Sequence, residues 1–297
     1  MADVKLDRTA LQRLNQSLLE AAKMDTDKAA IVAELLVQTD EIGVWTHGTA
    51  MVPNYVAELE AGTMATTGGY EVLKDTGPAM VWDGQYQHGL WLIPEAIKIG
   101  TARARKYGIS TIAVKQSHHI GCLAVLMRLV TDAGLVCIIT TSDPGGAWVA
   151  PFGGLDPVFT PNPIGVGYPA AGAPVLIDTC ASITTVSKLR DYADSGRKFD
   201  ANWLQDGHGQ PSNDPAVVNQ TPKGTLLPTG GQDHGHKGYG LALMVEMLTQ
   251  GLTGYGRKDK PARWGANVFL QIMDPALYGG AEAFSAQVNY VNDLCRA

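Results

Sequence analysis

Two histidines stand out in the sequence because each lies where a side chain can face a cleft. His47 lies in Thr46-His47-Gly48, between two segments with helical spacing, and His119 lies in Ser117-His118-His119-Ile120-Gly121, after a predicted strand. An imidazole titrates near neutral pH, so it can donate or accept a proton during a reaction. In α/β proteins the loop after a strand often carries the ligand site. Each histidine is therefore a candidate for proton transfer, with a structural or merely exposed side chain as the alternative.

A second set of candidate residues lies near residue 236. Asp233-His234-Gly235-His236 offers metal-binding side chains, but the glycines indicate a loop and no third ligand stands at a known spacing such as HExxH. We therefore predict no metal site, with a metal-dependent hydrolase or lyase that uses His234 and His236 as the alternative. Lys237 precedes a predicted helix, where it can meet a phosphate, or it is a solvated side chain in a flexible loop.

Helical spacing fills the first third of the chain. Asp7 can cap a first helix, a second follows, and a third runs from about Thr49 to Gly62. His47 therefore lies at a junction between two helices, where a helix N-terminus would direct free N–H groups toward a bound anion. These elements predict a helical domain over residues 1–70.

Beyond residue 70, predicted strands alternate with predicted helices. Ile109–Val114 has the pattern of a strand, Cys122–Ala133 that of a helix, and Asn267–Met273 that of a later strand. This alternation is typical of an α/β fold with helices layered on a sheet. We predict an α/β domain with a mixed sheet over residues 71–297, while a helix over 238–253 joins the helical domain.

The sequence does not predict a Rossmann domain. Residues 165–170, Gly-Val-Gly-Tyr-Pro-Ala, fit the string GxGxxA, but Pro161 and Pro163 interrupt the preceding run. A nucleotide-binding fingerprint needs a strand before it and a helix after it. Walker and GxSxG motifs are also missing. Any dinucleotide must therefore be held by a different geometry.

The composition excludes several other classes of protein. The chain has 297 residues, of which 45% are hydrophobic, so it can bury a large core. The net charge is -6 and no lysine or arginine cluster forms, which disfavours a nucleic-acid surface. No apolar stretch reaches the length of a membrane span, and the N-terminus lacks a signal peptide. The four cysteines form no CxxC pair. We expect a cytoplasmic protein that binds neither nucleic acid nor membrane.

Taken together, these segments resemble the type-2 malate/L-lactate dehydrogenase family over nearly the whole chain. The family's Ser-His-Gly corresponds to Thr46-His47-Gly48, followed by Pro53 and Tyr55, and its Ser-Asn-His-x-Gly corresponds to Ser117–Gly121. Four further motifs match as Asp83-Gly84, Asn162-Pro163, Asp178–Ser182 and Lys237-Gly238-Tyr239-Gly240. The order and spacing of these motifs make the resemblance specific.

The resemblance implies a homodimeric dehydrogenase or reductase with a non-Rossmann α/β cofactor domain that binds NAD(H) or NADP(H). Its substrate would be a small 2-hydroxy or 2-keto acid, a ketone or a cyclic imine. His47 would act as the acid/base, and His119 would orient the substrate or share the proton transfer. The residues matching substrate-contacting positions are Thr46, Met51, Ser117 and His118. Those matching cofactor-contacting regions are Ser142, Asn162, Asp178, Thr179, Cys180, Ser182, His236 and Lys237.

Two departures from the family pattern affect what the resemblance implies. Met51 stands where the family usually has an arginine, and methionine cannot clamp a substrate carboxylate as a guanidinium does. We therefore expect a bulkier or less acidic ketone or imine in place of an α-keto acid. Family chains also continue past the last helix, whereas this sequence stops at Ala297, so we expect either truncation or a different hold on the cofactor. A relative that binds cofactor without catalysis is the alternative.

Overall fold

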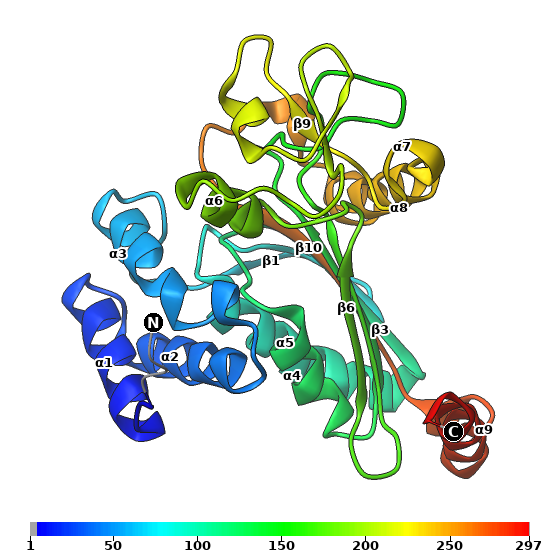
Figure 1. Ribbon diagram of the computed structural model, residues 1–297. Helices are drawn as coiled ribbons and strands as arrows, with labels where there is room; N and C mark the ends of the chain where they lie inside the picture. Colours follow the sequence, from blue (N-terminus) through cyan, green and yellow to red (C-terminus); the bar gives the residue numbers. More distant parts are fainter. Residues whose placement is uncertain (1–4, 297) are drawn as a thin grey trace. The chain divides into compact units, whose positions relative to one another are not determined.

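Figure 1 shows the computed structural model of the chain, which describes residues 5–296. The chain divides into two compact units. Unit 1 comprises Met1–Ile139, Gly165–Ile177 and Phe269–Ala297, and unit 2 comprises Thr140–Ile164 and Asp178–Val268. These units do not divide at the boundary predicted after residue 70. Sequence periodicity identifies single elements but does not show which of them share a core, and here the first helices share unit 1 with the following strands.

The first helices of unit 1 follow the predicted pattern. They are α1 (Arg8–Ala21), α2 (Thr26–Glu41), the short 3-10 turns Trp45–His47 and Thr49–Met51, and α3 (Val52–Glu60). Asp7 caps α1, since its carboxylate accepts a hydrogen bond of 2.8 Å from the backbone N–H of Ala10, as predicted. Lys28 is buried on α2 and donates to the Gly68 carbonyl at 2.6 Å and to Gln87 at 2.8 Å. This lysine therefore ties α2 to the segment after α3.

A mixed seven-stranded sheet confirms the predicted α/β fold (Figure 1). Its strand order is β1-β2-β3-β10-β4-β5-β6; β1 and β2 pair antiparallel, and β2 and β3 pair parallel. The parallel pair is joined through α4, as the geometry of parallel strands requires. The strands are β1 (Glu71–Asp75), β2 (Ala79–Asp83), β3 (Ile109–Ser117), β4 (Val136–Ser142), β5 (Pro163–Tyr168), β6 (Val175–Cys180) and β10 (Ala266–Met273). The helices α4 (Gly89–Tyr107), α5 (Leu123–Thr131) and α9 (Ala281–Arg296) belong to unit 1, as does the 3-10 turn Pro275–Leu277.

The glycines of the GxGxxA string lie within strand β5. A Cβ on Gly165 would come within 2.8 Å of the Met127 sulfur and 2.9 Å of Ile139. One on Gly167 would approach Met127 at 3.0 Å. These glycines therefore allow close packing of a strand against α5 and do not form a strand-to-helix phosphate loop.

Unit 2 is built around a small three-stranded sheet of order β8-β7-β9. Its core includes Phe159, Leu189, Phe199, Leu204 and Leu226. The elements are α6 (Val186–Asp194), β7 (Leu204–Gln205), β8 (Pro211–Ser212), a 3-10 turn Pro215–Asn219, β9 (Thr225–Leu226), α7 (Gly231–His234), α8 (His236–Glu246), a π turn Met247–Gly251 and a 3-10 turn Arg257–Asp259. The helix predicted from Gly238 begins two residues earlier, so His236 and Lys237 belong to its first turn. Over residues 5–296, no helix is both long enough and apolar enough to cross a membrane.

Candidate functional site

The structure brings the two predicted catalytic histidines together within unit 1. The rings of His47 and His119 stack with their centroids 5.8 Å apart and their planes at 28°. His47 ends the 3-10 turn Trp45–His47, and its side chain is partly exposed. The Thr46 hydroxyl lies 2.9 Å from Nδ1 of His47. The fold thus stacks the side chains of two residues that are 72 positions apart in the sequence, and the His47 side chain is partly exposed.

A carboxylate occupies the helix N-terminus that follows His47. The backbone N–H of Thr49 donates to Oδ2 of Asp40 at 3.0 Å. A Cβ on Gly48 would lie only 1.9 Å from the other carboxylate oxygen, so a glycine is required there. The sequence predicted free N–H groups for a bound anion at this junction. That prediction is wrong, because Asp40 of α2 already supplies the negative charge.

His119 is held in a neutral state by its surroundings. Its Nδ1 lies 2.7 Å from the Tyr55 hydroxyl and receives the backbone N–H of Gly121 at 3.4 Å. Burial keeps the pKa of His119 well below its usual value, and the neighbouring His47, His118 and His88 rings lower it further. At neutral pH His119 is therefore an uncharged imidazole.

Two buried histidines, His88 and His118, lie near His119, so four of the seven histidines gather in unit 1. His88 caps α4, since its Nδ1 accepts the N–H of Leu90 at 3.1 Å, and the Tyr55 ring meets it edge-on at 4.3 Å. Burial and the proximity of His118 keep the pKa of His88 well below its usual value. Burial lowers the pKa of His118 to about 4, although Glu58, 3.5 Å away, raises it in part.

Sequence reasoning missed His88, Glu58 and Asp40. His88 carries one usable signal, because it follows the predicted turn at Asp83-Gly84 and precedes a helical run, which is the position of an N-cap. Glu58 stands three residues after Tyr55 on α3 and so lies on the same helix face. Asp40 has no such signal, since it stands near the end of α2 among other polar residues.

Three of the four predicted substrate-contacting residues are buried. The side chains of Ser117 and His118 are fully buried, and Met51 is 9% exposed. The Ser117 hydroxyl donates to the carbonyl of His118 at 2.8 Å, which stiffens the strand-to-loop turn before His119. Thr46 is exposed beside His47. In unit 1, the predicted residues that reach solvent are therefore the exposed Thr46 and the partly exposed His47 and His119.

The predicted cofactor-contacting residues of unit 2 fall into two groups. Ser142 and Asn162 are buried and hydrogen-bonded internally: the Ser142 hydroxyl lies 2.8 Å from that of Thr249, and Asn162 donates to Glu246 at 2.9 Å. Ser182 is also buried and donates to the Thr184 carbonyl at 2.6 Å, while Cys180 is partly exposed. The exposed members are Asp178, Thr179, His236 and Lys237.

Gly238 brings the two predicted cofactor segments of unit 2 close together. A Cβ on this glycine would lie 2.4 Å from the Thr229 nitrogen and 2.6 Å from the Ala181 carbonyl oxygen. The Gly238 N–H donates to Thr229, whose own N–H donates to Ala181. The first turn of α8, with His236 and Lys237, therefore packs directly beside the segment Asp178–Ser182.

The structure also locates the residues of the metal alternative. His234 ends α7 and His236 begins α8, with ring centroids 6.3 Å apart. His236 packs edge-on against Phe152 at 5.7 Å. Across the part of the chain that the structure describes, no three or more histidine, cysteine, aspartate or glutamate side chains are grouped so that they could hold a metal ion.

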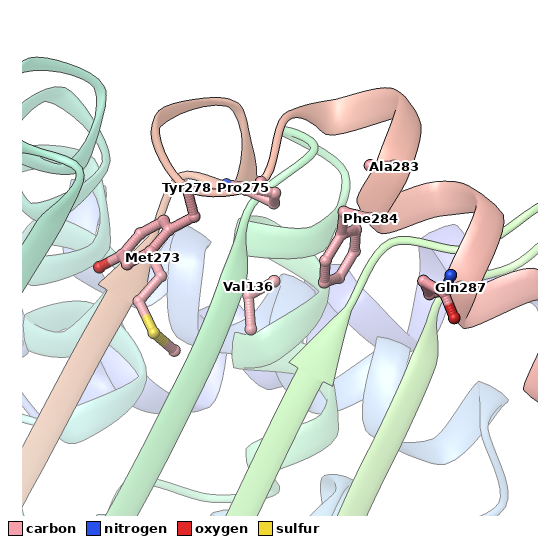
Figure 2. A pocket seen from close by; sticks show the side chains of 8 residues that line it. Val136, Met273, Pro275, Tyr278, Ala283, Phe284 and Gln287 are labelled. Atoms are coloured by element: carbon pink, nitrogen blue, oxygen red, sulfur yellow. The ribbon is translucent and has the colours of Figure 1, made fainter.

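An apolar cavity of about 410 Å³ lies elsewhere in unit 1, between the sheet and the last helix (Figure 2). Val136 of β4 and Met273 of β10 line it, and Phe284 of α9 points into it. Tyr278 and Gln287 provide polar groups at its edge. None of the histidines of the cluster lines this cavity, so it is separate from the candidate site.

The comparison with known proteins identifies the family. A sequence model of malate/L-lactate dehydrogenases matches residues 6–297. The L-lactate dehydrogenase of Cupriavidus necator is 30% identical over 292 residues, which are 96% of this chain and 82% of that protein. A Delta(1)-pyrroline-2-carboxylate/Delta(1)-piperideine-2-carboxylate reductase of Pseudomonas aeruginosa is 31% identical over 267 residues, 85% of this chain and 75% of that protein.

Solved structures agree with this assignment. The delta1-piperideine-2-carboxylate reductase of Pseudomonas syringae superimposes with a TM-score of 0.86 at 25% identity, covering 99% of this chain and 88% of that one. The match extends over both units, and the resemblance seen in the sequence motifs is confirmed. The relatives are dehydrogenases and reductases, so this chain is an enzyme that catalyses oxidation and reduction. The chain belongs to the malate/L-lactate dehydrogenase family.

Proposed function

We propose that the protein transfers hydride between NAD(H) or NADP(H) and a small 2-hydroxy or 2-keto acid, ketone or cyclic imine. The observation that carries this proposal is the stacking of the partly exposed His47 ring on His119, whose lowered pKa keeps it neutral. Reduction of a carbonyl or imine needs one proton at the oxygen or nitrogen for each hydride at the carbon. An exposed imidazole beside a fixed uncharged one suits that requirement.

His47 is the proposed acid/base. Its partly exposed ring can exchange protons with solvent, and the Thr46 hydroxyl at Nδ1 orients it. In reduction His47 gives a proton to the carbonyl oxygen or imine nitrogen; in oxidation it takes the proton from the hydroxyl or amine. His119 stays neutral and orients the substrate by hydrogen bonding. Ser117 and His118 support His119 from within the core.

The exposed residues of unit 2 fit a dinucleotide. When bound, the nicotinamide supplies or accepts the hydride. Lys237, in the first turn of α8, offers an exposed cation for phosphate, with the exposed His236 beside it. The exposed Asp178 and Thr179 belong to the segment that packs beside this turn at Gly238. A non-Rossmann mode of binding accords with GxGxxA lying inside β5.

Met51 shapes the proposed substrate preference. It is almost fully buried and carries no charge, so it provides no bidentate partner for a carboxylate. We therefore propose a ketone or cyclic imine as the better substrate and a 2-keto acid as the poorer one. The homodimer and the cytoplasmic location stay predictions from the sequence.

The test is the variant His47→Ala. We expect kcat to fall by about 100- to 10,000-fold, the usual contribution of a general acid/base, while quenching of reduced-nicotinamide fluorescence stays as in the wild type. The matched control is His208→Ala, which removes an exposed histidine from unit 2 and should leave kcat unchanged. Wild-type turnover in His47→Ala, or the absence of binding by either cofactor at millimolar concentration, would contradict the proposal.

A further inference from the structure

A tyrosine of α3 controls which nitrogen of His119 carries the proton. We propose that Tyr55 is a positioning residue, whose hydroxyl donates to Nδ1 of His119 and thereby holds the His119 proton on Nε2. Its role in turnover rests on the proposed function, whereas the protonation pattern is a property of the resting protein. The two can therefore fail separately.

Two groups lie close to Nδ1 of His119. The Tyr55 hydroxyl oxygen lies 2.7 Å away, a short contact that by itself does not tell which atom donates. The backbone nitrogen of Gly121 lies 3.4 Å away with its hydrogen directed at the same atom. A backbone N–H can only donate, so this long bond shows that Nδ1 offers its lone pair, and the shorter bond from Tyr55 supplies most of the energy that keeps the lone pair there. A neutral imidazole has one N–H, which therefore stands on Nε2.

The surroundings of Tyr55 support its role as the donor. The ring is fully buried and meets His88 edge-on at 4.3 Å. Burial raises the pKa of Tyr55, so the hydroxyl keeps its proton throughout the physiological range. The opposite arrangement would place an N–H of His119 against the N–H of Gly121, and two donors that face each other repel.

The loop after His119 has little freedom to escape this arrangement. Gly121 has a φ of +64°, and a Cβ there would lie 2.9 Å from Leu90 of α4. On the other side, α3 presents Tyr55 and Glu58 three residues apart, so both lie on one helix face. Glu58 lies 3.5 Å from Nε2 of His118. One helix thus holds both members of the His118-His119 pair.

The consequence for the reaction is a division of roles between the two histidines. An Nε2 that carries a proton can donate a hydrogen bond to a substrate oxygen or nitrogen but cannot accept a proton from it. Proton acceptance in the oxidation direction then falls to His47. Tyr55 sets this division without touching the substrate.

The test uses the full chain labelled with ¹⁵N-histidine and long-range ¹H–¹⁵N correlation spectra, with the His119 signals identified by their loss in His119→Gln. In the wild type we expect a protonated Nε2 and a lone pair on Nδ1. Tyr55→Phe keeps the ring and removes the hydroxyl, so Nδ1 loses the shorter of its two bonds and keeps the longer one from Gly121. We expect both tautomers to appear and kcat to fall by roughly 10- to 100-fold, as for a small misplacement of a reacting group.

The matched control is Tyr70→Phe, another tyrosine of unit 1, whose ring stacks on Trp82 at 4.1 Å. It should change neither the His119 signals nor kcat. A wild-type His119 with its proton on Nδ1 overturns the inference, even if Tyr55→Phe does not fold. So does a Tyr55→Phe protein with the wild-type tautomer and kcat. If the tautomer behaves as expected but no carbonyl or imine is turned over, the proposed function fails and the structural assignment of Tyr55 stands.

Discussion

The two units bury polar groups in opposite ways. In unit 1, the rings of His88, His118 and His119 lose their charge, because burial lowers all three pKa values and neighbouring histidines lower those of His88 and His119 further. In unit 2, Glu246 and Arg257 pair with atoms 2.9 Å apart, and Glu246 also accepts from the buried Asn162. The first arrangement leaves groups that can still change protonation.

The network of unit 2 is closed on itself. Asn162 accepts from Thr160 at 2.8 Å and donates to Glu246 and to the carbonyl of Ala242. Arg257 donates to Glu246 and to the carbonyl of Gly146. Every hydrogen-bonding group of the Asn162 amide is thus occupied by a partner inside unit 2. The histidine cluster can therefore change protonation, whereas the Asn162 network is fully occupied and makes unit 2 rigid.

The largest expected effect is the loss of stability of unit 1 in mild acid. His88, His118 and His119 stay neutral in the folded chain but take up protons near pH 6.5 when unfolded. Their contribution is therefore intact above pH 6.5 and is lost as the pH falls below it. At pH 5.5 each histidine destabilises the fold by about 1.4 kcal/mol, or about 4 kcal/mol together. Denaturant unfolding at pH 7.5 and 5.5 measures this change.

A variant of His88, the residue that caps α4, separates the contribution of one of these histidines. His88→Asn keeps a side-chain acceptor for the N–H of Leu90 but cannot titrate. The slope of the free energy of unfolding against pH should fall by roughly 1.4 kcal/mol per pH unit, because one proton fewer is taken up on unfolding. His208→Asn, at an exposed histidine, should leave the slope as it is. An unchanged slope in His88→Asn would mean that His88 is already protonated in the folded chain.

The second expected effect is a loss of stability in unit 2. Asn162→Leu would remove the hydrogen bonds to Glu246 and Thr160 and place a branched side chain at a φ of +50°. We expect a loss of about 3 kcal/mol in the free energy of unfolding, nearly independent of pH between 5.5 and 7.5. The control is Asn202→Leu, at an exposed asparagine of the same unit. A strong pH dependence in Asn162→Leu would remove the contrast between the two units.

The sequence predicted the helices and strands well, but it did not predict which of them pack together. Asp7 caps α1 and the glycine that follows α4 is left-handed, because caps and turns depend on neighbouring residues. The division into units could not be predicted, since it depends on which elements share a core. The pairing of His47 with His119 came from the family resemblance, because periodicity says nothing about two loops 72 residues apart.

The residues that hold the histidines in position were also not predicted from the sequence. Asp40, Glu58 and His88 come from three different helices or helix ends, and each acts through a contact with a distant residue. No local pattern requires Asp40 to accept the N–H of Thr49, and the sequence alone therefore predicted an open anion site there. Tertiary contacts decide which charged groups are already paired.

The third expected effect concerns the junction next to His47. Gly48→Ala would place a methyl group 1.9 Å from Oδ1 of Asp40, so the carboxylate must leave and the N–H of Thr49 loses its partner. We expect a loss of about 1 to 2 kcal/mol in stability, as for a lost helix cap, together with a lower kcat because His47 shifts. Gly69→Ala, where a Cβ has open space in the same unit, is the control. Full activity and stability in Gly48→Ala would show that Asp40 does not hold this junction.

The smallest expected effect is at the solvent edge of the cluster. Thr46→Val keeps the shape of the side chain and removes the hydroxyl that lies 2.9 Å from Nδ1 of His47. Because Thr46 is exposed, water can replace the lost hydrogen bond, and kcat should fall only about threefold, less than 1 kcal/mol. Thr46→Ser should restore the wild-type rate. A loss as large as that in His47→Ala would mean that the hydroxyl takes part in the proton transfer itself, and the reactive part of unit 1 would then extend beyond its histidines.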